Sequence, residues 1–235
     1  MTGDAAKPIR ADISALAVWL VCGALYAVFM FFAFTTPSVL KGELGLLENT
    51  QALFLAIALG LALYMAFQKN EKWLRWWLIF ISLGLFYLLT EETSWGQHYF
   101  DGPMFDFFSR FNDQGENNIH NSSSWFDQKP RALLLLGMIL GTIVHPLVKR
   151  FRGRGLFDNP WWLAPTLACL GCVVFSQIGA IPERLDDLHM FDISAQAFTG
   201  GYRSSEMEEV YIYMFFIVYL LSLGYRRKLR NAAAA

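Results

Sequence analysis

The stretch ISALAVWLVCGALYAVFMFFAF, residues 13–34, decides the fold class of this chain. It runs for 22 residues without a charged side chain, and about 20 consecutive apolar residues are what an α-helix needs to cross a bilayer core of about 30 Å. A helix on the surface of a soluble protein carries an apolar stripe, whereas this stretch is apolar on every side. It therefore predicts a transmembrane helix.

Five further stretches of the same kind follow along the 235 residues, of which 55% are apolar and 16% aromatic. The six predicted spans are residues 13–34, 50–67, 73–90, 132–148, 161–181 and 210–224. A soluble domain could not bury this much apolar surface. Because no flexible linker or repeat divides the chain, we expect residues 1–235 to form a single all-α membrane domain, a bundle of six transmembrane helices.

Charge alternates between successive connections. The termini, the turn at 68–76 and the loop at 149–160 hold 13 of the 19 basic residues and 4 of the 20 acids, so the remaining connections are strongly acidic. Basic residues in short loops mark the cytoplasmic side of a membrane protein. The sequence therefore predicts that both termini are cytoplasmic and that the acidic connections are periplasmic.

Two of the acidic connections are longer and mix phenylalanines and leucines with charges. Residues 100–129 and 182–205 are predicted to contain amphipathic segments that lie in the periplasmic membrane interface. They either roof a cavity or simply cap the bundle. An exposed greasy segment of this kind also suits a protein interface.

The pair Glu91 and Glu92 is the strongest indication of a site. The two carboxylates end the third predicted span, where the helix dipole opposes negative charge, so their position needs another explanation. If the helix continues, Glu91 and His98 share one face together with Ser94 or Trp95. Farther along, Glu116 and His120 are spaced i, i+4, close enough on a helix to share a metal or a proton.

Three of the four histidines lie on the acidic side. Three histidines with an acid suit one zinc ion with an open position for water, and a set of carboxylates and histidines from a helical bundle suits two iron or manganese ions. We expect a divalent metal of one of these kinds. Its predicted ligands are Glu91, His98, Glu116, His120, His189, Glu206 and Glu209. The predicted catalytic residues are Glu91, Glu92 and Glu116.

Two segments carry a resemblance to a known group of proteins. They are Glu91-Glu-x-Ser-Trp-Gly-Gln97 and Gln114-x-Glu-x-Asn-x-His-Asn121. They resemble a family of polytopic bacterial membrane proteins whose members carry E-E-x-S-W-G-Q followed by Q-x-E-x-N-x-H-N. The resemblance implies a bacterial inner membrane and importance for these positions, and it implies no particular activity.

These observations lead to two functional hypotheses. The first is a metalloprotein of the inner membrane that acts as an enzyme on a lipid or lipid-linked substrate at the periplasmic face, by hydrolysis with a metal-activated water or by oxidation at a two-metal centre. The alternative is a non-catalytic subunit that docks a partner in a membrane complex through its periplasmic roof. Expected partners are membrane lipids and either a complex partner or further copies of the chain; no nucleic acid is expected.

Overall fold

The computed structural model describes residues 12–42, 44–68, 70–100, 124–156, 164–188 and 203–234, and it is all-helical over these ranges. Within these ranges six helices are long and apolar enough to cross a membrane, which agrees with the predicted all-α multi-pass membrane protein. Most of the two predicted interfacial segments lies outside the described residues. Their placement in the interface stays a prediction.

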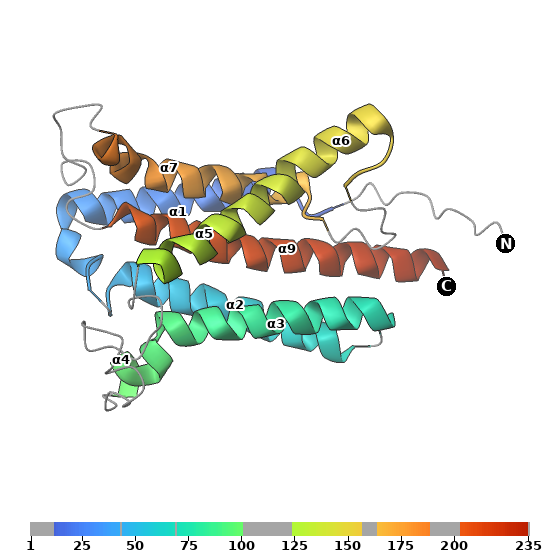
Figure 1. The fold of residues 1–235 in the computed structure, drawn as a ribbon, viewed down its shortest axis with the longest axis horizontal. Coiled ribbons are helices and arrows are strands. Elements are labelled where there is room, and N and C mark those ends of the chain that lie inside the picture. The colour runs from blue at the N-terminus through green and yellow to red at the C-terminus, as the bar shows by residue number, and fades with distance from the viewer. Residues whose placement is uncertain are drawn as a thin grey trace.

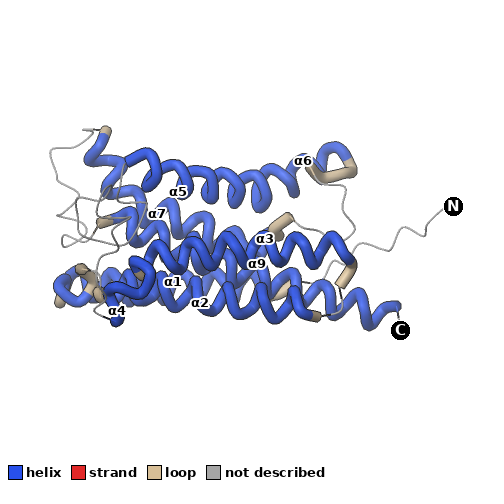
Figure 2. The backbone as a smooth tube through the Cα atoms, turned by 60° about the horizontal axis from the view of Figure 1, so that its bottom comes forward, coloured by secondary structure: helices blue, strands red, loops and turns tan. Residues whose placement is uncertain are grey.

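Six spanning helices pass back and forth along one axis (Figures 1 and 2). Five of them are single helices: α1 (Ala15–Thr35), α2 (Leu46–Phe67), α3 (Lys72–Glu92), α7 (Leu170–Asp187) and α9 (Ser204–Ala234). The fourth along the chain is a continuous helix made of α5 (Ser124–Ile139), a π-helical turn (Leu140–Val144) and α6 (His145–Arg152). The short helix α4 (Gln97–Phe100) follows α3 after a 3-10 turn (Ser94–Gly96).

The two ends of the bundle differ in what they carry. At one end α1 begins and α9 ends, and we call it the terminal end (Figure 1). At the opposite end α3 finishes with Glu91 and Glu92, and α9 starts with Glu206, Glu208 and Glu209. We call this the glutamate end.

The ends of some helices differ from the ends of the predicted spans. The sixth was predicted to begin at residue 210, yet α9 begins at Ser204, because acids in a first turn are compatible with a helix although they lower hydropathy. The fifth was predicted to begin at residue 161, whereas the chain forms a 3-10 turn (Leu167–Cys169) before α7. Thr166 caps this turn, since its hydroxyl accepts a hydrogen bond from the Ala168 backbone at 3.3 Å.

Helix α9 is the centre of the bundle. Its apolar window is 72% buried inside the protein, against 17% for α1. Tyr211 joins α9 to two neighbours, because its hydroxyl donates to the Cys22 carbonyl of α1 at 3.1 Å and its ring lies 5.6 Å from that of Phe175 in α7. A Cβ at Gly179 would lie 2.7 Å from Met207 Cγ, so glycine permits the close approach of α7 to α9.

The fourth span is interrupted by a π-helical turn directly before His145 and Pro146. Proline lacks the backbone N–H that would bond to the carbonyl four residues earlier, and its ring clashes with that carbonyl. A π turn, which accommodates one extra residue, is one of the ways in which a helix absorbs such a defect. The span therefore continues to Arg152 despite the proline.

Candidate functional site

The last turn of α3 places two carboxylates at the glutamate end. Glu91 is only 4% exposed, and Glu92 is half-buried beside it. The helix does not continue to His98, so the condition for Glu91 and His98 to share one helical face is not met, because the next residues turn sharply. Ser94, Trp95 and Gly96 have φ values of 45°, 55° and 83°, in the left-handed region that ends a right-handed helix.

This turn folds the chain back over Glu91. The indole N–H of Trp95 donates to Glu91 Oε1 at 3.3 Å, and Ser94 is buried beneath it. Left-handed conformations of residues other than glycine cost of order 1–3 kcal/mol and persist only where surrounding contacts hold them. The predicted proximity of Trp95 to Glu91 is thus present, although it comes from a strained turn and not from a continuing helix.

A pocket lies where α3, α5 and α9 meet, and about 40 Å³ of it is open to the centres of water molecules. This is room for a few waters or a partly hydrated ion, since one water needs about 10–15 Å³ on this measure. Its lining residues come from three helices and are Tyr87, Leu88, Glu91, Glu92, Pro130, Arg131, Leu134, Glu209, Ile212 and Tyr213.

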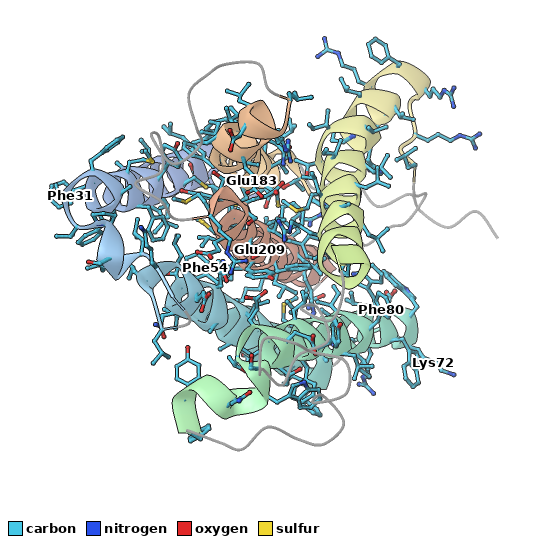
Figure 3. The ribbon with its side chains drawn as sticks, turned by 60° about the vertical axis from the view of Figure 1, so that its left-hand side comes forward. Phe31, Phe54, Lys72, Phe80, Glu183 and Glu209 are labelled. Carbon is cyan, nitrogen blue, oxygen red and sulfur yellow. The ribbon has the colours of Figure 1, made fainter. Side chains whose placement is uncertain are left out.

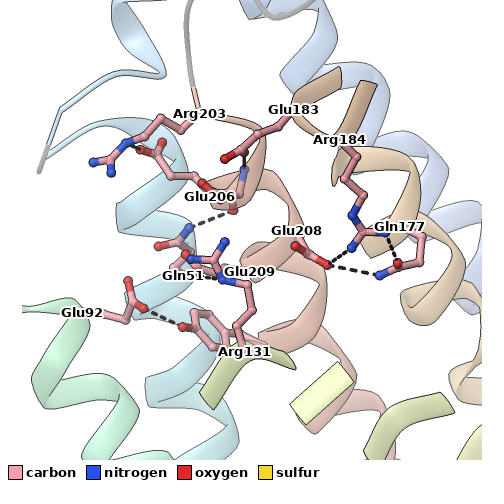
Figure 4. A network of polar contacts seen from close by, with 12 residues as sticks. Gln51, Glu92, Arg131, Gln177, Glu183, Arg184, Arg203, Glu206, Glu208 and Glu209 are labelled. Atoms are coloured by element: carbon pink, nitrogen blue, oxygen red, sulfur yellow. Dashed lines mark hydrogen bonds and ion pairs between the residues drawn. The ribbon is translucent and has the colours of Figure 1, made fainter. Parts of the chain in front are cut away.

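Polar contacts hold the carboxylates of the pocket in place (Figure 4). Arg131 Nε forms an ion pair with Glu209 Oε1 at 3.0 Å, and both side chains are about four-fifths buried. The Tyr213 hydroxyl donates to Glu92 Oε1 at 2.5 Å. Each of these contacts joins two helices, so the pocket is part of the packing between α3, α5 and α9.

The lining of the pocket is electrostatically unbalanced. The described residues of the lining include three carboxylates and one guanidinium, whose formal charges sum to −2. The C-terminus of α3 adds the negative end of a helix dipole, equivalent to about half an elementary charge. Glu209 lies beyond the first turn of α9, where the helix dipole has little effect on a carboxylate. The pocket therefore attracts positive charge.

Other acids at this end belong to packing contacts outside the pocket (Figure 4). Glu208 is 6% exposed and pairs with Arg184 at 2.9 Å, and Gln177 donates to the same oxygen at 3.2 Å. Glu206 pairs with Arg203 at 3.2 Å. Glu183 caps α9 by accepting the Ser205 backbone N–H at 2.9 Å.

The structure thus brings together three of the predicted site residues, Glu91, Glu92 and Glu209. Glu206, predicted as a metal ligand with Glu209, is not among the residues that line the pocket, because it lies one turn closer to the start of α9 and bonds with Arg203. Four predicted residues lie outside the described side chains: His98, Glu116, His120 and His189. Among the side chains that are described, no three His, Cys, Asp or Glu residues could hold a metal ion.

Sequence reasoning missed Arg131 and Glu208. Arg131 lies just before the predicted span at 132–148 and gave no signal in the sequence, because its helix begins at Ser124 and the dipole acts mainly on the first turn. Its ion pair with Glu209 depends on the packing of α5 against α9. Glu208 gave no signal either, because an acid in the first turns of a helix is ordinary.

The hydrogen bond from Tyr213 to Glu92 gives a direct test of the pocket. Tyr213→Phe removes only the hydroxyl, and a hydrogen bond to a charged group contributes about 1.5–3 kcal/mol. We expect the free energy of unfolding in detergent to fall by this amount. Tyr225→Phe on the same helix, where the ring is 41% exposed, is the control and should change stability little. Equal effects of the two substitutions would contradict the contact.

Comparison with models of protein families, with curated protein sequences and with solved structures gave no match to this chain. What the pocket does is inferred from its own geometry.

Proposed function

We propose that the chain is an enzyme of the bacterial inner membrane, and that it acts on a lipid or lipid-linked substrate in the pocket between α3, α5 and α9. The observation that carries this proposal is the meeting of Glu91, Glu92 and Glu209 with Arg131 in one pocket. Ionisable groups are expensive near a membrane and are retained mainly where they have a use.

The depth of the pocket suits a lipid headgroup. Glu91 and Glu92 are the last residues of one candidate span, and Arg131 is the second residue of another. Side chains at span ends lie where the hydrocarbon core meets the headgroups. Leu88, Leu134 and Ile212 complete the lining with apolar surface that an acyl or prenyl chain could contact.

The orientation follows from the distribution of charge. The basic connections at the terminal end favour the cytoplasm, which assigns both termini to the cytoplasm and the pocket to the periplasmic face. A substrate carried by the outer leaflet would then reach the pocket without crossing the membrane.

A divalent cation fits the charge of the pocket. Carboxylate oxygens are ligands for hard cations, and the formal charge of −2 matches one such ion. The described side chains do not form a complete metal site, so the proposal needs further ligands from His98, Glu116, His120 or His189. Whether zinc, iron or manganese binds depends on how many histidines join. A bound divalent ion would supply an acidic water and polarise a carbonyl or phosphoryl oxygen.

The side chains of the pocket have separate roles in this proposal. Glu92, held by the Tyr213 hydroxyl, accepts a proton from the attacking group. Arg131 orients an anionic group of the substrate, since a guanidinium presents several donors to a phosphate or carboxylate. Glu91 holds the cation, and the Trp95 indole N–H fixes one of its oxygens.

Metal analysis tests the cation directly. We expect wild-type protein, purified in detergent without chelator, to hold a stoichiometric divalent metal, and Glu91→Gln with Glu92→Gln to weaken binding of added Mn²⁺ more than about a hundredfold. Glu208→Gln is the matched control, because Glu208 is a buried acid of the same end that is paired with Arg184 outside the pocket. If wild-type protein is metal-free and does not bind added Mn²⁺, Zn²⁺ or Fe²⁺, the proposal that the pocket holds a divalent cation is overturned.

A second candidate function rests on α4. Tyr99 and Phe100 are 47% and 85% exposed on this short helix, which lies at the glutamate end (Figure 1) and contacts α2 through a hydrogen bond from the Tyr99 hydroxyl to Asn49 at 2.9 Å. Exposed aromatic side chains here suit an accessory subunit that docks a partner or a second copy of the chain. Stoichiometric recovery of one partner in mild detergent, lost in Phe100→Ser, would favour this function over the enzyme.

A further inference from the structure

A second pocket lies at the terminal end, on the opposite side of the membrane from the glutamates. It is formed by the end of α6 and the turn that follows, and about 270 Å³ of it is open to the centres of water molecules. This is several times the volume of the pocket at the glutamate end. Its lining residues are Val148, Arg152, Arg154, Gly155 and Leu156.

The turn that forms this pocket is fixed against the helix. Gly153, with a φ of 73°, ends α6, and the chain then folds back. The Leu156 backbone N–H donates to His145 Nδ1 at 3.0 Å. Gly155 lies so close to the imidazole that a Cβ there would be 2.1 Å from His145 Cε1. The shape of the pocket is therefore built by packing and does not depend on a ligand.

The charge of the pocket favours an anion. Two arginines line it, and none of the five described lining residues is acidic. The C-terminus of α6 contributes about half a negative charge, which is outweighed by two guanidinium groups. Arginine binds phosphate with paired N–H donors, which makes it a better phosphate ligand than a point charge.

The depth of the pocket and its apolar neighbours favour a lipid as the ligand. Arg152 ends the candidate span Pro130–Arg152, so the pocket lies at the depth of headgroups. Phe151 and Leu156 are 80% and 45% exposed beside it, where acyl chains would contact them. Figure 3 shows side chains with nitrogen ends projecting outward from α6, away from the other helices. A soluble anion would make no favourable contact with these apolar side chains.

We propose that this pocket binds the phosphate of an anionic phospholipid from the leaflet at the terminal end. Basic residues that serve only to orient a membrane protein need no cavity and no fixed turn. Basic pockets beside transmembrane helices on the cytoplasmic side are known to hold anionic headgroups. The site is independent of the glutamate pocket and of any reaction there.

Native mass spectrometry of delipidated protein with added phosphatidylglycerol tests the proposal. We expect saturable binding of phosphatidylglycerol well above that of phosphatidylcholine. Arg152→Gln and Arg154→Gln should each weaken binding about tenfold, because each removes a charge-assisted contact with phosphate. The double variant Arg75→Gln, Lys228→Gln removes two exposed charges from the same end and should change binding less than about twofold.

Gly155→Ala probes the shape of the pocket without changing its charge. It should displace the turn from His145 and weaken phosphatidylglycerol binding. If that variant fails to fold, the Arg152→Gln and Arg154→Gln variants still test the proposal, because both arginines are exposed. Equal binding of both lipids, or equal losses in the arginine and control variants, would overturn the proposal. Inorganic phosphate that displaces the lipid or stabilises the protein equally well would show a soluble-anion site instead.

Discussion

Replacing Glu91 with glutamine is expected to abolish the change in lipid composition that the wild-type chain causes when it is expressed in bacterial cells. Loss of a carboxylate that takes part in the chemistry lowers rates by about 10²–10⁴-fold. Mass spectrometry of total lipid extracts, from cells with matched amounts of each protein, measures the effect. It compares wild type, Glu91→Gln and empty vector, and it therefore works without an identified substrate.

With metal removed from both proteins by a chelator, the same substitution should leave the protein at least as stable as the wild type. Glu91 stands beside Glu92 at the C-terminus of α3, where both the neighbouring charge and the helix dipole oppose it. Glutamine removes that repulsion, and its carbonyl can still accept the Trp95 indole N–H. Inactivity with undiminished stability is what a functional carboxylate shows. A large loss of stability would instead indicate a structural role.

Glu208→Gln is the control in the lipid comparison as well. Lipid composition should be the same with this variant as with wild type, because its carboxylate lies outside the pocket. A lipid profile that is the same for wild type and empty vector, from protein that also binds no metal, would overturn the proposed enzyme. The accessory-subunit function would then be favoured.

Tyr211→Ala should destabilise the bundle by about 3–5 kcal/mol, the largest effect on stability that we expect from a single substitution. Tyr211 is fully buried at the point where α1, α7 and α9 meet. Alanine would leave a cavity among these three helices and would remove the hydrogen bond from Tyr211 to the Cys22 carbonyl. The matched Tyr211→Phe keeps the ring and loses one hydrogen bond, so it should cost only about 1 kcal/mol.

Labelling of the buried cysteines measures the unfolding of these variants. Cys22, Cys169 and Cys172 are free and buried, so a thiol-reactive dye labels them only as the helices separate. Labelling during a titration with denaturing detergent should show an earlier midpoint for Tyr211→Ala than for Tyr211→Phe. Overlapping curves for the two variants would contradict the packing around Tyr211.

The six spans were predictable because each is a long apolar run without Lys or Arg, and such a run is what a hydropathy pattern detects. Helix ends were less predictable. The start of α9 carries Glu206, Glu208 and Glu209, which lower hydropathy without ending the helix. The π turn before Pro146 left no trace in the apolar pattern, since an extra residue does not change hydropathy.

The site was predicted in part. The conflict between charge and helix dipole singled out Glu91 and Glu92, which do end α3 and line the pocket, because that argument needs only the position of a helix end. Whether α3 continues to His98 was left open by the sequence, since the left-handed turn at Ser94 and Trp95 is not set by local preference. The ion pair of Glu206 with Arg203 was not foreseen, because spacing along one helix gives the face of a residue but not its contacts.

The π turn at Leu140–Val144 changes the direction in which side chains on one half of the fourth span point relative to those on the other half. Each residue of an α-helix advances its direction by about 100°, so a single extra residue turns everything beyond it by roughly that angle. Arg131 can therefore face α9 on one side of the membrane while His145 faces its own turn on the other. Without the extra residue, His145 would be rotated by roughly that angle relative to Arg131.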